Sequence, residues 1–289
     1  MSDIFSSFHP LVNMLFFLFA ILFTMFFTHP VCLFISFLCA FTYSVCLKGK
    51  KALRFNAVFI LPMLLVTALL NPAFNHEGAT ILTYLPDGNP LTLESIAYGA
   101  AAALMLAAVV SWFSCFNEIM TTDKIVYLSG RAIPALSLIL SMSLRLVPRF
   151  IEQIKTVSAA QKCIGRDPSS GSVFTRARRG LMIMSILVTW ALENAIETAD
   201  SMKGRGYGLP GRTAFSIFRF DKRDRAALIF FLITGAYIIA GSFAGGLYFR
   251  YFPTIASRGV SPYAISLFAA YASLCAAPVA IKIYNISLT

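Results

Sequence analysis

The sequence predicts an all-α, polytopic membrane protein with about six transmembrane helices and a cytoplasmic block of amphipathic helices. Three observations support this fold class. Of the 289 residues, 58% are apolar and only 13% are charged, which is too hydrophobic for a soluble domain of this size. Several apolar runs approach the roughly 20 residues that a helix needs to cross a bilayer. The basic residues are concentrated in one part of the chain.

The apolar runs give the expected membrane helices in chain order. Small residues cluster within them, in the segment Gly99 to Ala108 and in the GxxxG of Gly241 and Gly245, where they allow helices to approach closely. The six expected spans lie near Leu11 to Phe27, Val31 to Leu47, Asn56 to Leu70, Leu93 to Phe116, Ala226 to Tyr248 and Pro262 to Ile281.

The distribution of Lys and Arg predicts the orientation. The turn after the second span holds Lys48, Lys50, Lys51 and Arg54, whereas the loop from Asn71 to Thr92 holds none. Since cytoplasmic loops are enriched in basic residues, both termini should face the cytoplasm. The first apolar run has no preceding Lys or Arg and no cleavage-like site after it, so we expect it to be retained rather than removed as a signal peptide.

This topology divides the chain into three parts: an N-terminal membrane domain with four spans (1–116), a cytoplasmic helical domain (117–225) and C-terminal membrane spans (226–289). The middle part holds 17 of the 24 basic residues and 9 of the 13 acidic ones, a net charge of 17 − 9 = +8 out of +11. Such a block suits anionic lipid headgroups. It lacks the interleaved aromatic and basic residues of a nucleic-acid fold, so we expect no nucleic acid partner.

The cytoplasmic part contains two amphipathic helices. The run Ile133 to Val147 is short and carries Arg145, which favours an interfacial helix over a further crossing. Beyond it, apolar residues recur at helical spacing from Val147 to Val157, and Gly165 and Pro168 should end that helix. A second helix is expected from about Leu181 to Lys203. Its packing stripe consists of Val188, Ala191, Ala195, Ala199 and Met202.

Both helices end in a short basic segment that contains glycine. The first tip consists of Lys162, Cys163, Ile164, Gly165 and Arg166, and the second consists of Lys203, Gly204, Arg205 and Gly206, about forty residues later. Glycine closes helices and a cation complements the carbonyl end, so ordinary C-capping is one interpretation. The alternative is that two rigid tips with guanidinium groups bind carboxylates of a partner.

Several chemistries find no support in the sequence. There is no GxxxxGK[ST] motif, and the glycines of the second tip do not fit a phosphate-binding spacing. Glu193 and Glu197 are typical of a solvated helix face, and the three histidines are scattered. Cys32, Cys39 and Cys46 stand seven apart, too far along a helix to share zinc. We therefore expect no catalytic residues and no metal site.

The motifs together resemble a known family. The order RLVPRF, AQKCIGR, ADSMKGRGYG and GRT, over about Thr121 to Thr213, is similar to the transmembrane coupling (T) component of energy-coupling factor transporters, the cobalt-permease-like family. That family has two cytoplasmic coupling helices whose Ala-Arg-Gly tips dock into two ABC-type ATPases. The resemblance implies that Gly204, Arg205 and Gly206 form the second tip, and Cys163, Ile164 and Gly165 the first.

Both tips depart from the family pattern. Gly204 stands where alanine is usual, and Ile164 stands where arginine is expected, leaving Lys162 or Arg166 as possible sources of the missing charge. The resemblance further implies a non-catalytic subunit of the bacterial or archaeal cytoplasmic membrane that binds no cofactor itself. ATP and Mg would be bound by the partner ATPases. A separate small substrate-binding membrane protein (the S component) would carry a vitamin or a transition-metal ion.

Two other functions stay open at this point. The chain could be an ordinary ABC importer permease that binds substrate itself, in which case it should work as a pair of permease chains. It could also be a membrane enzyme of lipid phosphate metabolism, for which an acidic metal cluster would be needed. The only close Asp pair, Asp221 and Asp224, lies among four basic residues and is more typical of the flank of a span.

Overall fold

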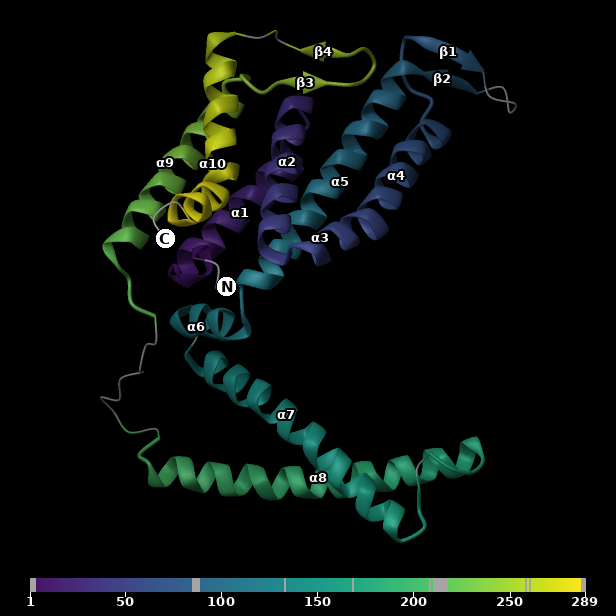
Figure 1. The fold of residues 1–289 in the computed structure, drawn as a ribbon, viewed down its shortest axis with the longest axis vertical. Helices are drawn as coiled ribbons and strands as arrows, with labels where there is room; N and C mark the ends of the chain where they lie inside the picture. The colour runs from purple at the N-terminus through teal and green to yellow at the C-terminus, as the bar shows by residue number, and fades with distance from the viewer. Residues whose placement is uncertain are drawn as a thin grey trace. The chain divides into compact units, whose positions relative to one another are not determined.

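The computed structural model describes residues 4–84, 89–132, 134–167, 169–207, 209, 218–257, 259 and 261–286. The described elements are helices apart from two short hairpins (Figure 1). They fall into two compact units. Unit 1 consists of Met1–Ile125 and Phe218–Thr289, and unit 2 of Val126–Ile217.

Unit 1 is built from long apolar helices. Three of them begin at a proline, whose missing amide is harmless in the first turn. At the start of α1 and α2 the imidazole Nδ1 atoms of His9 and His29 accept hydrogen bonds from the amides two residues on. The helices are α1 (Pro10–Phe26), α2 (Pro30–Lys48), α3 (Lys50–Phe55), the π-helical η2 (Asn56–Ile60), α4 (Leu61–Phe74), α5 (Leu93–Ile119), α9 (Lys222–Phe243) and α10 (Pro262–Ile286), with the 3-10 helix η1 (Phe5–Ser7) before α1.

Two hairpins that the sequence analysis did not foresee lie at one end of unit 1 (Figure 1). Strand β1 (Ile81–Tyr84) pairs antiparallel with β2 (Pro90–Thr92), and β3 (Phe249–Arg250) pairs antiparallel with β4 (Ala256–Ser257). The amide of Ala79 donates to the carbonyl of Pro253 at 3.0 Å, so the two hairpin regions are hydrogen-bonded to each other. The strands are too short for an alternating hydrophobic pattern to show in the sequence.

The core of unit 1 is aromatic in the middle and polar at one point. The buried Phe16 ring of α1 lies 5.5 Å from that of Trp112 in α5 and 5.3 Å from that of Phe231 in α9, centroid to centroid. A polar cluster adjoins these rings, in which the Thr24 hydroxyl lies 2.6 Å from the Ser36 hydroxyl and 3.2 Å from the Tyr271 hydroxyl. The Trp112 indole donates to Ser36 Oγ at 2.9 Å. Such interhelical hydrogen bonds join α1, α2, α5 and α10 in an apolar interior.

Small residues allow close packing, and of the two glycines of the GxxxG motif only Gly241 lies within α9. A Cβ on Gly241 would collide with Leu267 of α10, and a Cβ on Gly99 would lie 2.8 Å from the carbonyl of Ala68 in α4. Gly245, the second glycine of the motif, lies beyond the end of α9 with φ +79°. The fifth expected span is therefore wrong at its end, because α9 ends at Phe243 rather than Tyr248.

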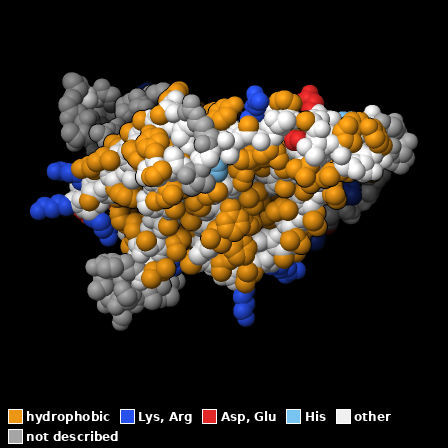
Figure 2. All heavy atoms as spheres, turned by 90° about the horizontal axis from the view of Figure 1, so that it is seen from above, with side chains coloured by type: hydrophobic (Ala, Val, Ile, Leu, Met, Phe, Trp, Pro, Cys, Tyr) orange, Lys and Arg blue, Asp and Glu red, His pale blue; other side chains and the backbone are white. Residues whose placement is uncertain are grey.

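The exposed surface of unit 1 is strongly apolar. Leu69 and Phe74 of α4 are 71% and 80% exposed, and hydrophobic side chains cover much of the face shown in Figure 2. Six described helices are long and apolar enough to span a membrane: α2, Lys50–Phe74, α5, α8, α9 and α10. The chain is a multi-pass membrane protein.

The sequence and the structure both give six helices that could span a membrane, but they are not the same six. Helix α1 has 17 residues and is a shorter apolar helix, and the third expected span is longer at both ends, running from Lys50 to Phe74. Helix α8 (Val173–Gly204) meets the length and composition of a span although the sequence analysis assigned that segment to the cytoplasm. Its 32 residues exceed the expected helix because Ser172 caps it, accepting a hydrogen bond from the amide of Thr175.

Unit 2 contains the end of α6 (Thr122–Ala132), together with α7 (Pro134–Cys163) and α8. The expected interfacial helix and the amphipathic helix after it are one continuous helix, α7, which corrects the prediction; Ile133 lies outside the described residues. Pro148 sits inside α7 and removes one backbone hydrogen bond. Pro148 and Leu144, whose carbonyl loses its usual partner, are both exposed residues, and the helix continues through them.

Candidate functional site

The two long helices of unit 2 contact each other through a small core. Val157 of α7 and Ile183 and Leu187 of α8 are buried together. Nearby, the rings of Phe150 and Trp190 meet edge to face with centroids 5.4 Å apart. A core of this size leaves most of both helices exposed.

The packing stripe expected on α8 is not the face that contacts α7. Val188 is 53% exposed, Ala195 and Ala199 are also exposed, and Ala191 and Met202 are half-buried. At 100° per residue, the buried Ile183 and Leu187 lie about a quarter turn away from that stripe. The role of the stripe in packing against a partner stays a prediction.

The first tip closes α7 with a Schellman motif. Helix α7 ends at Cys163, and Gly165 has a left-handed φ of +78°. The Gly165 amide donates to the carbonyl of Lys162 at 3.0 Å, and the Arg166 amide donates to the carbonyl of Gln161 at 2.9 Å. This pair of bonds defines the motif.

The second tip closes α8 in the same way. Helix α8 ends at Gly204, and Gly206 has φ +76°. The Gly206 amide donates to the carbonyl of Lys203 at 2.9 Å, and the Tyr207 amide donates to that of Met202 at 3.0 Å. The Gly208 and the GRT segment (Gly211 to Thr213) that extend the family pattern lie outside the described residues.

The shared motif fixes a residue-by-residue correspondence between the tips. Aligned on the left-handed glycines, Lys162 corresponds to Lys203 and Cys163 to Gly204, while Ile164 corresponds to Arg205. Neither Lys162 nor Arg166 therefore stands where Arg205 stands. The resemblance to the family had placed Ile164 at the position of the expected arginine, and the left-handed glycines give the same correspondence from the backbone.

The surroundings of the two tips differ. Arg179 of α8 donates to the carbonyls of Asp167 and Ser170 at 2.6 and 3.0 Å and so braces the loop after the first tip. The Arg166 guanidinium lies 3.5 Å from the sulfur of Met182. Within the described residues, the exposed Arg205 guanidinium has no such partner.

One carboxylate lies next to the first tip. Lys162 Nζ is 3.7 Å from Asp167 Oδ2, with the lysine side chain 71% exposed. Hydrogen bonds from the Ser169 hydroxyl and amide, followed by the nearby Lys162 charge, lower the pKa of Asp167. The charge of Lys162 is thus partly matched within the chain.

The Schellman geometry alone does not mark a functional site. Helix α9 ends in the same motif, with Gly245 N bonded to Ser242 O and Gly246 N bonded to Gly241 O, and that end carries no basic residue. The C-capping interpretation of the tips is therefore confirmed as far as the backbone is concerned. What distinguishes the tips of α7 and α8 is the exposed basic and apolar chemistry that the motif holds in place.

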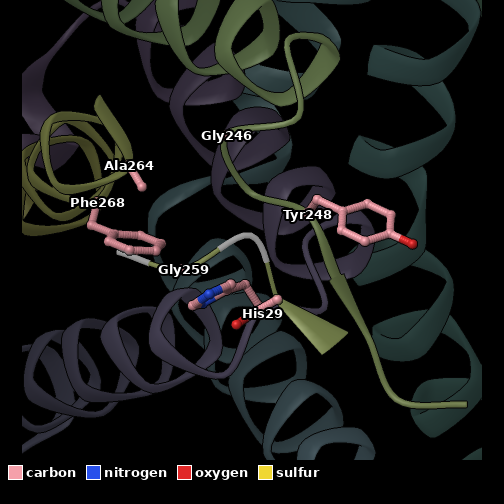
Figure 3. A pocket seen from close by; sticks show the side chains of 7 residues that line it. His29, Gly246, Tyr248, Gly259, Ala264 and Phe268 are labelled. Atoms are coloured by element: carbon pink, nitrogen blue, oxygen red, sulfur yellow. The ribbon is translucent and has the colours of Figure 1, made fainter. Parts of the chain in front are cut away.

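A small cavity lies in unit 1, near the hairpin of β3 and β4 (Figure 3). Its volume is about 40 Å³, which is room for little more than a water molecule. His29 borders it with a pKa lowered by burial, and its ring packs against Phe268 with centroids 4.8 Å apart. The other lining residues are Gly246, Tyr248, Ser257, Gly259 and Ala264. A cavity of this size and lining does not suggest catalysis.

The Asp pair of α9 has a structural role. Asp221 is the N-cap residue of α9 and Asp224 is the third residue of its first turn, and each side chain accepts a hydrogen bond from the backbone of the other. In the described part of the chain, no group of three or more His, Cys, Asp or Glu side chains is placed to hold a metal ion. The pair therefore caps a helix.

Comparison with known proteins relates the chain to one family. The sequence model of CbiQ, described as a cobalt transport protein, matches residues 1–215. The energy-coupling factor transporter transmembrane protein EcfT of Bacillus selenitireducens is 28% identical over 209 residues, covering 68% of this chain and 75% of the relative. EcfT of Exiguobacterium sibiricum is 25% identical over 217 residues, covering 70% of this chain and 82% of the relative. EcfT of Limosilactobacillus fermentum is 33% identical over 94 residues, covering 32% of this chain and 35% of the relative.

Proposed function

Because the chain belongs to the family of CbiQ cobalt transport proteins, we propose that it relays ATP-driven motion within an energy-coupling factor transporter. In this proposal the chain is the transmembrane component. Its two cytoplasmic tips dock into two ABC-type ATPases, which bind ATP and Mg, and its helices move a separate substrate-binding membrane protein. The chain itself binds neither cofactor nor substrate.

The observation that carries the proposal is the pair of matched helix ends. Each holds a lysine and a following exposed residue, Ile164 or Arg205, on a backbone fixed by two hydrogen bonds. A helix end that is already ordered loses little conformational entropy when it docks. The exposed Arg205 guanidinium can form a bidentate hydrogen bond with a carboxylate. Ile164, which is 68% exposed, offers an apolar contact at the corresponding position of the first tip.

Exposed apolar faces on α7 and α8 support a membrane-embedded partner. Val147, Ile151 and Ile154 of α7 are 42–52% exposed, and Leu192 and Ile196 of α8 are 62% and 65% exposed. Such surfaces suit lipid or the apolar helices of a substrate-binding subunit. They are compatible with helices that lie along the cytoplasmic surface of the membrane, with both chain termini on that side.

Charge reversal at the second tip tests the proposal. The variant Arg205→Glu should abolish copurification of the ATPases while insertion into the membrane stays intact, because a carboxylate at this position would repel an acidic groove. Arg178→Glu, which reverses an exposed charge at the other end of the same helix, is the matched control and should leave copurification unchanged. Unchanged recovery of ATPases with Arg205→Glu would overturn the proposal.

A further inference from the structure

The N-terminal segment Phe5–His9 lies beside both points at which the chain passes between the two units. In Figure 1 the N-terminus is at the end of unit 1 where α5 ends and α9 begins. All contacts that follow lie within unit 1. They join this segment to the residues just before Val126 and just after Ile217.

The contact before the first passage is made by a buried lysine. Lys124, only 5% exposed, donates from Nζ to the carbonyl of Ser6 at 2.6 Å and to the carbonyl of Ile119 at 3.0 Å. In the amide orientation that satisfies both of its neighbours, Asn13 accepts a third bond from the same nitrogen at 3.1 Å. All three protons of the ammonium group are thus used. Ile119 is the last residue of α5, so the cation also faces a helix carbonyl end.

The contact after the second passage is made by a buried carboxylate. Asp224, 2% exposed, accepts from the amide of His9 at 3.0 Å through Oδ1 and from the amide of Asp221 at 3.0 Å through Oδ2. It therefore joins the first residue before α1 to the start of α9. The negative charge sits in the first turn of α9, where the helix dipole favours it.

Ring contacts reinforce the second connection and anchor the segment itself. The His9 ring meets that of Phe220 edge to face at 5.2 Å, and the Arg223 guanidinium lies 4.7 Å from the centre of the Phe8 ring. Phe5 is fully buried and packs against Phe16 at 5.2 Å. The segment is therefore part of the core of unit 1.

We infer that Phe5–His9 is a clamp that holds the end of α5 and the start of α6, and the start of α9, in fixed positions within unit 1, with Lys124 and Asp224 as positioning residues. The inference rests on the proposed function. Motion of unit 2 can reach the helices of unit 1 along the chain through residues 119–125 and 218–225, which are the residues that this segment holds. A buried charge is costly unless its hydrogen bonds are all made, so both junctions tolerate few alternative arrangements. One short segment holds the two junctions, and displacement of either is transmitted to α1 and the core.

Hydrogen exchange on the complete complex tests the clamp without knowledge of the transported substrate. The complex with its ATPases and substrate-binding protein is compared with and without ATP and vanadate, in the natural chain and in Lys124→Met and Asp224→Asn. Both variants should be recovered in complexes and should keep the ATP-dependent change in exchange at the tips. In both variants, the ATP-dependent change in hydrogen exchange should be roughly tenfold smaller than in the natural chain at residues 5–9, 119–125 and 218–225. The His9 amide should also exchange roughly tenfold faster in Asp224→Asn.

Controls separate the clamp from general stability. Asp123→Asn, an exposed neighbour of Lys124, should behave as the natural chain, and Lys124→Arg should restore the response in part because it keeps the cation. Asparagine has nearly the same volume as aspartate. Asp224→Asn therefore tests the clamp by itself in the case that Lys124→Met does not assemble into complexes. Variants that still pass the change to unit 1 would overturn the clamp and leave the proposed function standing. A natural chain whose tips do not respond to ATP would overturn both.

Discussion

The tip of α7 and the tip of α8 share one backbone and differ in what they present. In both, a left-handed glycine and two hydrogen bonds close the helix. The α7 tip exposes Ile164 and is braced by Arg179 from the neighbouring helix. The α8 tip exposes Arg205, which has no bonded partner in the described part of the chain. The comparison teaches that one backbone motif can hold either an apolar or a charged side chain at the same position of a helix end.

The largest effect should follow from making the second tip resemble the first. Arg205→Ile leaves the backbone motif unchanged but removes the guanidinium, so ATPase affinity should fall by at least roughly thirtyfold. Titration of detergent-solubilised protein with ATPases, at low and high salt, measures the loss. The salt dependence of binding should also become shallower. An affinity within twofold of the natural chain would show that the charge of this tip is dispensable.

A smaller loss should follow from removing the apolar side chain of the first tip. Ile164→Ser is expected to weaken ATPase binding roughly tenfold, because the proposed contact at this position buries apolar surface. Ile164→Val is the control and should bind normally. Ile164→Arg separates the alternatives by the same titration: tighter binding would indicate that the first groove is acidic and that Ile164 is a defect rather than a contact.

The shared backbone should matter about equally at both ends. Gly165→Ala and Gly206→Ala force a side chain into the left-handed region, and each should weaken binding roughly fivefold. Asparagine at the same positions should cost less, because it tolerates that region. At Gly206 a Cβ would also lie 3.1 Å from Leu209, whereas at Gly165 it meets nothing within 4 Å. A larger effect at Gly165 would contradict the matched geometry.

The smallest effect should come from Lys162. Its ion pair with Asp167 is exposed, so Lys162→Met should change ATPase affinity by less than about twofold. Because the pKa of Asp167 is lowered, the stability gained from its hydrogen bonds and this pair is present above the ordinary aspartate pKa and is lost as the pH falls through the lowered value. Thermal unfolding of the two proteins should therefore converge at low pH. A tenfold loss of affinity would instead make Lys162 a docking residue.

The sequence predicted five of the six long apolar helices and the location of both tips because apolar length and glycine position are local signals. It failed where distant parts of the chain decide the outcome. The continuity of α7 through Pro148 depends on which side of the helix is exposed, and the buried face of α8 depends on where α7 crosses it. The bond from Lys124 to Ser6 joins residues 118 positions apart, which no local pattern encodes.

The position of the small core between α7 and α8 makes them levers of unequal arm. Counting at 1.5 Å per residue from this core, α7 ends roughly 9 Å beyond Val157, whereas α8 ends roughly 26 Å beyond Leu187. A tilt about this crossing sweeps the α8 tip through at least twice the path of the α7 tip. Equal strokes by two ATPases would then turn the pair of helices rather than merely shift it.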